Sequence, residues 1–379
     1  MIFDLIEYLR NTITPFDRIK GFKTKKPKIG WLGVFPPYQN GAAAVSYYFV
    51  RRLLKRKDIE VALIPINNKI EKSKFKGAVY CKIDNPSLDA IIFWCLGDKF
   101  RLYSVRTKGS KALKAAWQTI HFGKKEDVKN QLLEISDADL KILMTSWAFK
   151  EAKKELSNCA AVPFGVDTSY FRPGRKDRFE VIFVSRIHYY KGVMPFLDTI
   201  PYVLNECPDI VFKLHSPMDR FSPHISEMEK AISETKKRYP TNFFHDSSWR
   251  PYHKMKDIYR SASVLAFPSN NEGFGIPLLE AMACGAPCIV SDVPPMNEIV
   301  VKNTGFVLKQ KKAANYHGFA FPNPKDMARR IISLRKNKKY NQKMSDNCRK
   351  HIQKNYELSK TADDFVNLVV KEIKSRSRK

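Results

Sequence analysis

The chain has 379 residues, enough for two domains that each bury a hydrophobic core. Its formal net charge of +29 implies an anionic partner, such as a phosphorylated ligand, an acidic membrane surface or a nucleic acid. No apolar run reaches the roughly 18 residues that a transmembrane helix needs, and no signal peptide is evident. The seven cysteines show no C-x-x-C pair or zinc spacing, as expected for reduced thiols in a cytosolic protein.

Residues 1–28 form a basic N-terminal segment that begins with a short apolar stretch. The apolar side chains within Met1–Leu9 could share one face of a helix. An amphipathic helix beside a basic run predicts an interfacial membrane anchor. Alternatively, this short helix packs on the body of the protein and its lysines are only solvated. The lysines of the run are at positions 20, 23, 25, 26 and 28.

The region after this segment has the alternating strands and helices of a parallel α/β domain. A helix is predicted from near Gly41, where Gly41 and Ala42 could admit a phosphate or a sugar. Another strand is predicted to end at His121 and so to bring an imidazole to the carboxyl edge of the sheet; alternatively, His121 only satisfies its own hydrogen bonds there. Ser146 is predicted to cap a helix. Further strands are predicted at 29–35, 60–64, 90–96 and 140–145.

A basic, polar linker at Gly174–Arg178 places a domain boundary near residue 170. The predicted strand Glu180–Ser185 leads into Arg186, and Lys191 follows five residues later. Arg can hold a diphosphate through two hydrogen bonds and Lys adds a point charge, so the pair predicts a cationic clamp at a sheet edge. Alternatively, it is a surface pair on a basic protein. Helices are predicted at Ile225–Arg238 and Tyr252–Ser261, and a basic surface insertion at Lys309–Tyr316.

The most informative stretch is a strand, a glycine turn and a helix. Its turn contains Glu272 and the backbone N–H groups of Gly273–Gly275, which suit a phosphate at a helix N-terminus. Glu280 lies eight residues after Glu272, about two helical turns on. A carboxylate beside a bound phosphate is repelled unless it accepts hydrogen bonds from hydroxyl groups of the ligand. Two such carboxylates therefore predict a ligand with hydroxyl groups on either side of a phosphate, that is, a nucleotide sugar. Alternatively, Glu272 caps the helix and Glu280 is a solvated helical acid.

The sequence EGFGIPLLEAMACGAPCIV, from Glu272 to Val290, resembles the signature of family 4 retaining glycosyltransferases of the GT-B type. That signature holds two Glu residues separated by seven positions. Val162–Asp167 resembles the interdomain turn of the family. The resemblance implies an α/β fold of two Rossmann-like domains facing a cleft, with a C-terminal helix that crosses back to the first domain. It divides the chain into an acceptor domain at 29–170, a nucleotide-sugar domain at 171–355, and a crossing helix with a basic tail at 356–379.

The resemblance also implies a metal-independent, retaining hexosyltransferase that needs no cofactor. UDP or GDP is the nucleotide expected from the family. The basic charge and the predicted anchor favour an acceptor that is lipid-linked or a glycan, at the cytoplasmic face of a membrane; the alternative is a soluble acceptor. The alternative is a basic, non-catalytic GT-B-like module that binds membranes. A specific nucleic-acid binder is disfavoured because the sequence has no helix-turn-helix, zinc or ribonucleoprotein signature. The expected catalytic residues are Glu272, His121, Arg186 and Lys191. The expected donor-binding residues are Gly41, Arg186, Lys191, Gly273, Phe274, Gly275 and Glu280, with no metal ligands.

Overall fold

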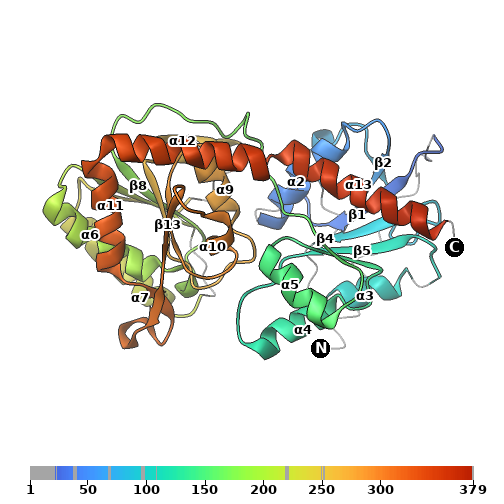
Figure 1. Ribbon diagram of the computed structural model, residues 1–379, viewed down its shortest axis with the longest axis horizontal. Helices are drawn as coiled ribbons and strands as arrows, with labels where there is room; N and C mark the ends of the chain where they lie inside the picture. The colour runs from blue at the N-terminus through green and yellow to red at the C-terminus, as the bar shows by residue number, and fades with distance from the viewer. Residues whose placement is uncertain are drawn as a thin grey trace. The chain divides into compact units, whose positions relative to one another are not determined.

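The computed structural model separates into two compact units (Figure 1). The first contains the chain up to Phe164 and again from Leu358, and the second contains Gly165–Glu357. The structure describes residues 22, 24–36, 41–66, 70–94, 99–107, 109–217, 222–248, 250 and 252–377. The predicted interfacial helix at Met1–Leu9 lies outside the described residues.

The first unit is built on a seven-stranded sheet with the strand order β3-β2-β1-β4-β5-β6-β7, in which every neighbouring pair is parallel. Its strands are β1 (Lys28–Gly33), β2 (Glu60–Pro65), β3 (Val79–Tyr80), β4 (Ala90–Trp94), β5 (Leu113–Gln118), β6 (Leu140–Leu143) and β7 (Cys159–Ala161). Its helices are α2 (Gly41–Leu53), η1 (Lys72–Lys74), α3 (Lys99–Val105), α4 (Lys125–Glu134), α5 (Ser146–Glu155) and α13 (Leu358–Arg376).

The central strands of this sheet are buried on both faces, which is why their sequences are continuous apolar runs. On one face, the C-terminal helix α13 packs against α2 and β5. Its Phe365 is fully buried, with its ring centroid 4.8 Å from that of Trp117 and 5.2 Å from that of Phe49. The predicted return of the last helix to the first domain is therefore confirmed.

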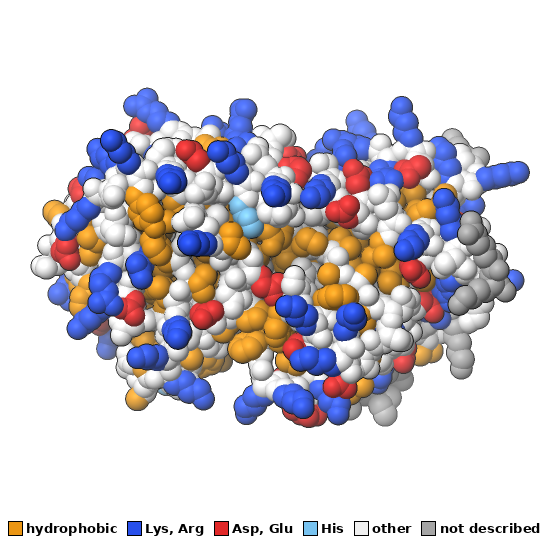
Figure 2. All heavy atoms as spheres, viewed as in Figure 1, with side chains coloured by type: hydrophobic (Ala, Val, Ile, Leu, Met, Phe, Trp, Pro, Cys, Tyr) orange, Lys and Arg blue, Asp and Glu red, His pale blue; other side chains and the backbone are white. Residues whose placement is uncertain are grey.

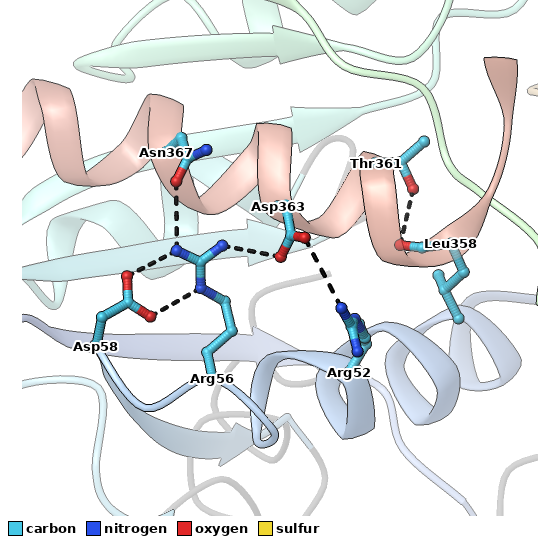
Figure 3. Close-up of polar contacts among 7 residues, drawn as sticks. All are labelled: Arg52, Arg56, Asp58, Leu358, Thr361, Asp363 and Asn367. Atoms are coloured by element: carbon cyan, nitrogen blue, oxygen red, sulfur yellow. Dashed lines mark hydrogen bonds and ion pairs between the residues drawn. The ribbon is translucent and has the colours of Figure 1, made fainter. Parts of the chain in front are cut away.

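Polar contacts fix the outer side of α13 (Figure 3). The Arg56 guanidinium donates to both carboxylate oxygens of Asp58, at 2.8 and 2.6 Å. It also donates to Asp363 at 2.9 Å and to Asn367 at 3.3 Å, both on α13. Arg52 lies 3.7 Å from the same Asp363 carboxylate. One arginine thus joins the loop before β2 to the last helix.

The second unit contains a six-stranded parallel sheet with the order β10-β9-β8-β11-β12-β13 and a two-stranded antiparallel hairpin. The strands are β8 (Glu180–Val184), β9 (Val211–His215), β10 (Phe243–Asp246), β11 (Val264–Phe267), β12 (Cys288–Ser291), β13 (Gly305–Leu308), β14 (Gln310–Lys312) and β15 (Ala320–Pro322). The helices are η2 (Tyr189–Lys191), α6 (Val193–Glu206), α7 (Ile225–Arg238), α8 (Tyr252–Ser261), α9 (Ile276–Ala283), α10 (Met296–Ile299), η3 (Ala314–Tyr316), α11 (Pro324–Lys336) and α12 (Lys338–Asn355). In both sheets the first strand of the unit lies between the second and the fourth, which is the Rossmann strand order.

Two local predictions are corrected. Thr145, and not Ser146, caps α5, because the Thr145 hydroxyl accepts a hydrogen bond from the Ala148 N–H at 3.0 Å. The segment Lys309–Tyr316 is more than a surface insertion. It contributes β14, and Tyr316 is 6% exposed, with its hydroxyl donating to Asp198 at 2.7 Å.

The surface carries the charge expected from the sequence. In Figure 2, Lys and Arg side chains are spread over the visible face of both units, with fewer acidic side chains between them. The excess positive charge is therefore not confined to one element on this face. Among the described residues, no helix is both long and apolar enough to cross a membrane.

Candidate functional site

The candidate site lies at the carboxyl ends of β8 and β11. These two strands are neighbours, and the strand order of the second sheet reverses between them. Open α/β sheets bind ligands at such a switch point. Arg186 and Lys191 follow β8, whereas the turn that contains Glu272 follows β11. The topology therefore brings the predicted cationic pair and the predicted acidic turn to one edge of one sheet.

Lys191 and Glu272 form an ion pair at this edge. The Lys191 Nζ lies 2.7 Å from Glu272 Oε1, and the side chains are 12% and 11% exposed. The same ammonium group donates to the Asn271 carbonyl at 3.4 Å and lies 4.8 Å from the centre of the Tyr190 ring. Because the pair is shielded from water, each charge depends on the other, or on a ligand that replaces it.

The loops after β8 and β11 are fastened together by their backbones. The Asn270 N–H donates to the Tyr190 carbonyl at 2.7 Å. Gly192 has a φ of +80°, and a Cβ added there would lie 2.5 Å from the Pro268 carbonyl oxygen. Only glycine permits this approach, which holds the preceding Lys191 against the turn.

The glycine turn leads directly into α9. Gly275 has a φ of +90° and is the N-cap residue of this helix. Within the described part of the chain, none of the backbone N–H groups of Gly273, Phe274 and Gly275 donates a hydrogen bond. The Phe274 side chain is 5% exposed and anchors the turn in the core. Unbonded N–H groups at a helix N-terminus are suited to an anionic group.

The two carboxylates of the motif are buried rather than solvated. Glu272 is 8% exposed and does not cap α9, since Gly275 holds that position. Glu280 is 3% exposed, so the alternative of a solvated helical acid is wrong. The fully buried Tyr259 lies beside it: burial, together with the charge of Glu280, raises the pKa of the Tyr259 hydroxyl well above its usual value. Tyr259 therefore stays protonated and can act as a donor.

The remaining predicted site residues are more exposed or lie in the first unit. Arg186 is exposed, beyond the end of β8. Gly41 begins α2. His121 is exposed, and its backbone N–H donates to Gln131 at 2.7 Å. The prediction that the strand ends at His121 is wrong: β5 ends at Gln118 because its partner there, Leu143, is the last residue of β6.

The sequence analysis missed the residues that support the turn. Ser269 is fully buried, and its carbonyl accepts a hydrogen bond from the Gln310 side chain at 3.3 Å. The Asn270 side chain donates to the Ala320 carbonyl at 2.8 Å. The hairpin of β14 and β15 thus contacts the turn from more than 40 positions away in the sequence. Neither contact could be predicted from the sequence, because neither follows a hydrophobic period or belongs to a sequence motif.

Known proteins resemble this chain in sequence and in fold. The model of the family described as glycosyl transferases group 1 matches residues 168–351. The chain is 34% identical over 84 residues to the O-antigen chain mannosyltransferase RfbU of Salmonella typhimurium, a match that covers 22% of this chain and 23% of that protein. It is 29% identical over 172 residues to the MMP α-(1→4)-mannosyltransferase of Mycolicibacterium hassiacum, covering 45% of this chain and 39% of that protein. The matches therefore span less than half the length of these two relatives.

A likeness in structure extends over nearly the whole chain. The Anabaena protein HepE, solved in complex with UDP and glucose, superposes with a TM-score of 0.72 and 12% identity, over 91% of this chain and all of that one. This degree of identity supports the fold alone, whereas the range matched by the family model contains the residues of the candidate site in the second unit. The second unit therefore belongs to the glycosyl transferases group 1 family, within a chain that has the GT-B fold.

Proposed function

We propose that this protein is a retaining glycosyltransferase that moves a sugar from a nucleotide-sugar donor to an acceptor. The observation that carries the proposal is the buried Lys191–Glu272 ion pair at the switch point of the second sheet, beside backbone N–H groups that donate to none of the described residues. A nucleotide sugar offers a diphosphate to the cation and to the N–H groups, and hydroxyl groups to the carboxylates.

In the proposed complex, Lys191, Arg186 and the N–H groups of Gly273–Gly275 bind the diphosphate. They stabilise the negative charge that develops on it as the bond to the sugar breaks, and so supply the role that a metal ion has in other transferases. Glu280 binds the ribose hydroxyls, and the buried Tyr259 side chain lies beside that carboxylate.

Glu272 binds hydroxyls of the transferred sugar and fixes its orientation. Gly41 and His121 belong to the first unit and are proposed to act from the acceptor domain. Retention then requires the acceptor hydroxyl to attack on the face that the diphosphate leaves. Positioning of donor and acceptor is the main contribution of the protein in such a mechanism.

The donor is proposed to be a UDP- or GDP-sugar. HepE holds UDP and glucose in its structure, and the two relatives compared above are mannosyltransferases. The net charge of +29 and the basic segment 1–28 support an acceptor on an anionic surface. We therefore favour a lipid-linked or glycan acceptor at the cytoplasmic face of a membrane.

The test is turnover of a panel of UDP-, GDP- and ADP-sugars, with and without anionic liposomes. One donor is expected to be consumed, and Glu272→Ala is expected to abolish its consumption. Glu229→Ala, an exposed acid on α7, is the matched control and is expected to keep full activity. Stimulation by liposomes would support the membrane acceptor.

Full activity of Glu272→Ala would refute the assigned role of this residue. If no donor were consumed and no nucleotide bound, the protein would instead be a non-catalytic binding module. Liposome and oligonucleotide binding across a salt series would then identify its anionic partner.

A further inference from the structure

Three side chains that could bind a metal ion lie together and are not among the candidate donor-site residues: His224, Glu227 and His317. Their ligand atoms all lie within 4.8 Å of one another. His317 Nε2 lies 2.7 Å from Glu227 Oε2, and His224 Nδ1 lies 3.9 Å from the same oxygen. Two ligand atoms on a tetrahedral zinc ion are about 3.3 Å apart, given zinc–ligand bonds of about 2.0 Å. The observed distances fall on either side of that spacing.

The three residues come from two segments that are far apart in the sequence. His224 precedes α7 and Glu227 lies in its first turn, whereas His317 follows η3 between β14 and β15. Figure 1 shows the orange hairpin beside α7, and the contact between Glu227 and His317 joins residues 90 positions apart. A shared ion would therefore cross-link the hairpin to the helix.

The backbone presents both histidines in an uncommon conformation. His224 and His317 have φ values of 57° and 50°, in the left-handed region that non-glycine residues rarely adopt. Their rings stack with centroids 3.7 Å apart and planes 11° apart. Their side chains are 36% and 41% exposed, and each ring already presents one nitrogen to the Glu227 carboxylate, at 3.9 and 2.7 Å.

The buried side chain of Tyr189 packs beside the two histidine rings. The Tyr189 ring lies 4.9 Å from the His224 ring and 5.2 Å from the His317 ring. Tyr189 is 1% exposed, and its hydroxyl has no hydrogen-bond partner among the residues that the structure describes. Such a group is costly to bury. A metal-bound water or a reoriented carboxylate oxygen would give it an acceptor, as partners behind metal ligands commonly do.

We propose that His224, Glu227 and His317 bind one divalent transition-metal ion of the zinc class, which fastens the β14–β15 hairpin to α7. Two imidazoles and one carboxylate are ligands that zinc accepts, with a fourth position left to water. None of the three ligands is among the candidate donor-site residues, and the proposal does not depend on the proposed glycosyl transfer.

The test is titration of untagged, chelator-treated full-length protein with Zn²⁺, followed by calorimetry, and with Co²⁺, followed by visible absorption. One ion is expected to bind per chain, and Zn²⁺ is expected to raise the melting temperature. His317→Ala and Glu227→Gln are each expected to weaken binding at least tenfold and to remove the thermal shift. Glu229→Gln, an exposed acid on the same helix, is the control and is expected to bind as the wild type does.

The proposal is overturned if no saturable binding of one ion per chain occurs, which would leave only the ion pair between His317 and Glu227. It is equally overturned if both variants bind as tightly as the wild type. A thiolate charge-transfer band in the Co²⁺ spectrum would also refute it, because the ion would then be bound by cysteine.

Discussion

The Lys191 ammonium lies 2.7 Å from a Glu272 carboxylate oxygen in a nearly buried ion pair. A bound diphosphate would have to compete with Glu272 for this cation. Replacing Glu272 with Gln is therefore expected to raise the affinity for the matching nucleoside diphosphate several-fold, while sugar transfer falls at least 100-fold. Lys191→Met is expected to lower both, with a loss of about tenfold or more in affinity because a charge-assisted contact to phosphate is removed.

Calorimetry with UDP and GDP, together with turnover of the donor, measures the two effects separately. The informative result is the opposite sign of the two affinity changes. If both variants weakened nucleotide binding equally, the ion pair would stabilise the conformation of the loop and would not compete with the ligand.

Gly192 is the residue that allows Lys191 to reach the turn. Gly192→Ala is expected to lower the free energy of unfolding by about 3 kcal/mol, because the new Cβ would lie 2.5 Å from the Pro268 carbonyl oxygen and φ is +80°. Gly77→Ala is the matched control: its φ is +87°, but nothing lies within 4 Å of an added Cβ. That change is expected to cost only about 1 kcal/mol, from backbone strain alone.

Urea denaturation followed by circular dichroism gives both free energies of unfolding. Nucleoside diphosphate binding should also weaken in Gly192→Ala and stay unchanged in Gly77→Ala. Equal costs for the two variants would show that the contact with Pro268 relaxes without consequence.

Local signals were sufficient for much of the second unit. Helices α7 and α8 have the predicted bounds, and the glycine turn enters α9 as its sequence indicates. The reason is that turn residues, caps and apolar periodicity act over a few neighbouring positions. The same signals placed Glu272, Lys191 and the glycines at one sheet edge, because parallel strands present their carboxyl ends together.

What the sequence could not supply depends on contacts between distant segments. The end of β5 is set by the length of β6, and this left His121 beyond the strand. Thr145 and Ser146 are adjacent hydroxyl residues, and only the position where the strand ends decides which of them caps α5. The neighbours of Glu280 and Ser269, namely Tyr259 and Gln310, come from other elements and were invisible to spacing.

The last helix offers a prediction about the first unit (Figure 3). The Arg56 side chain is 17% exposed and contacts Asp58 and Asp363, whereas the 3.7 Å pair of Arg52 with Asp363 has side chains that are 34% and 43% exposed. Arg56→Met is therefore expected to destabilise this unit by about 1–2 kcal/mol, since it breaks a network of charge-assisted hydrogen bonds. Arg52→Met, the control, should cost no more than about 0.5 kcal/mol.

Tryptophan fluorescence during urea denaturation reports this change. Four of the five tryptophans lie in the first unit, at positions 31, 94, 117 and 147. A loss in Arg52→Met as large as that in Arg56→Met would indicate that Asp363, rather than the bidentate contact with Asp58, dominates the network.

The lowered pKa of His215 predicts how the stability of the second unit depends on pH. Burial lowers the pKa of His215 from 6.5 to about 4, despite the Asp246 carboxylate 3.7 Å away, and the neighbouring charges of Lys213 and Arg250 act in the same direction as burial. Between these two pKa values, the unfolded chain binds a proton that the folded protein does not. Folding stability therefore falls as the pH falls through this window, and above about pH 7 His215 contributes no such dependence.

From about pH 7.5 to about pH 5, this single group should lower the free energy of unfolding by about 2 kcal/mol. His215→Gln removes the titration, so its stability should decline less steeply by this amount, whatever packing cost it carries at high pH. Urea denaturation of both proteins at several pH values, with the difference at about pH 8 as the reference, measures the effect. Parallel curves over the whole range would mean that the His215 imidazole is protonated as readily in the folded protein as in the unfolded chain, and that the Asp246 carboxylate offsets its burial.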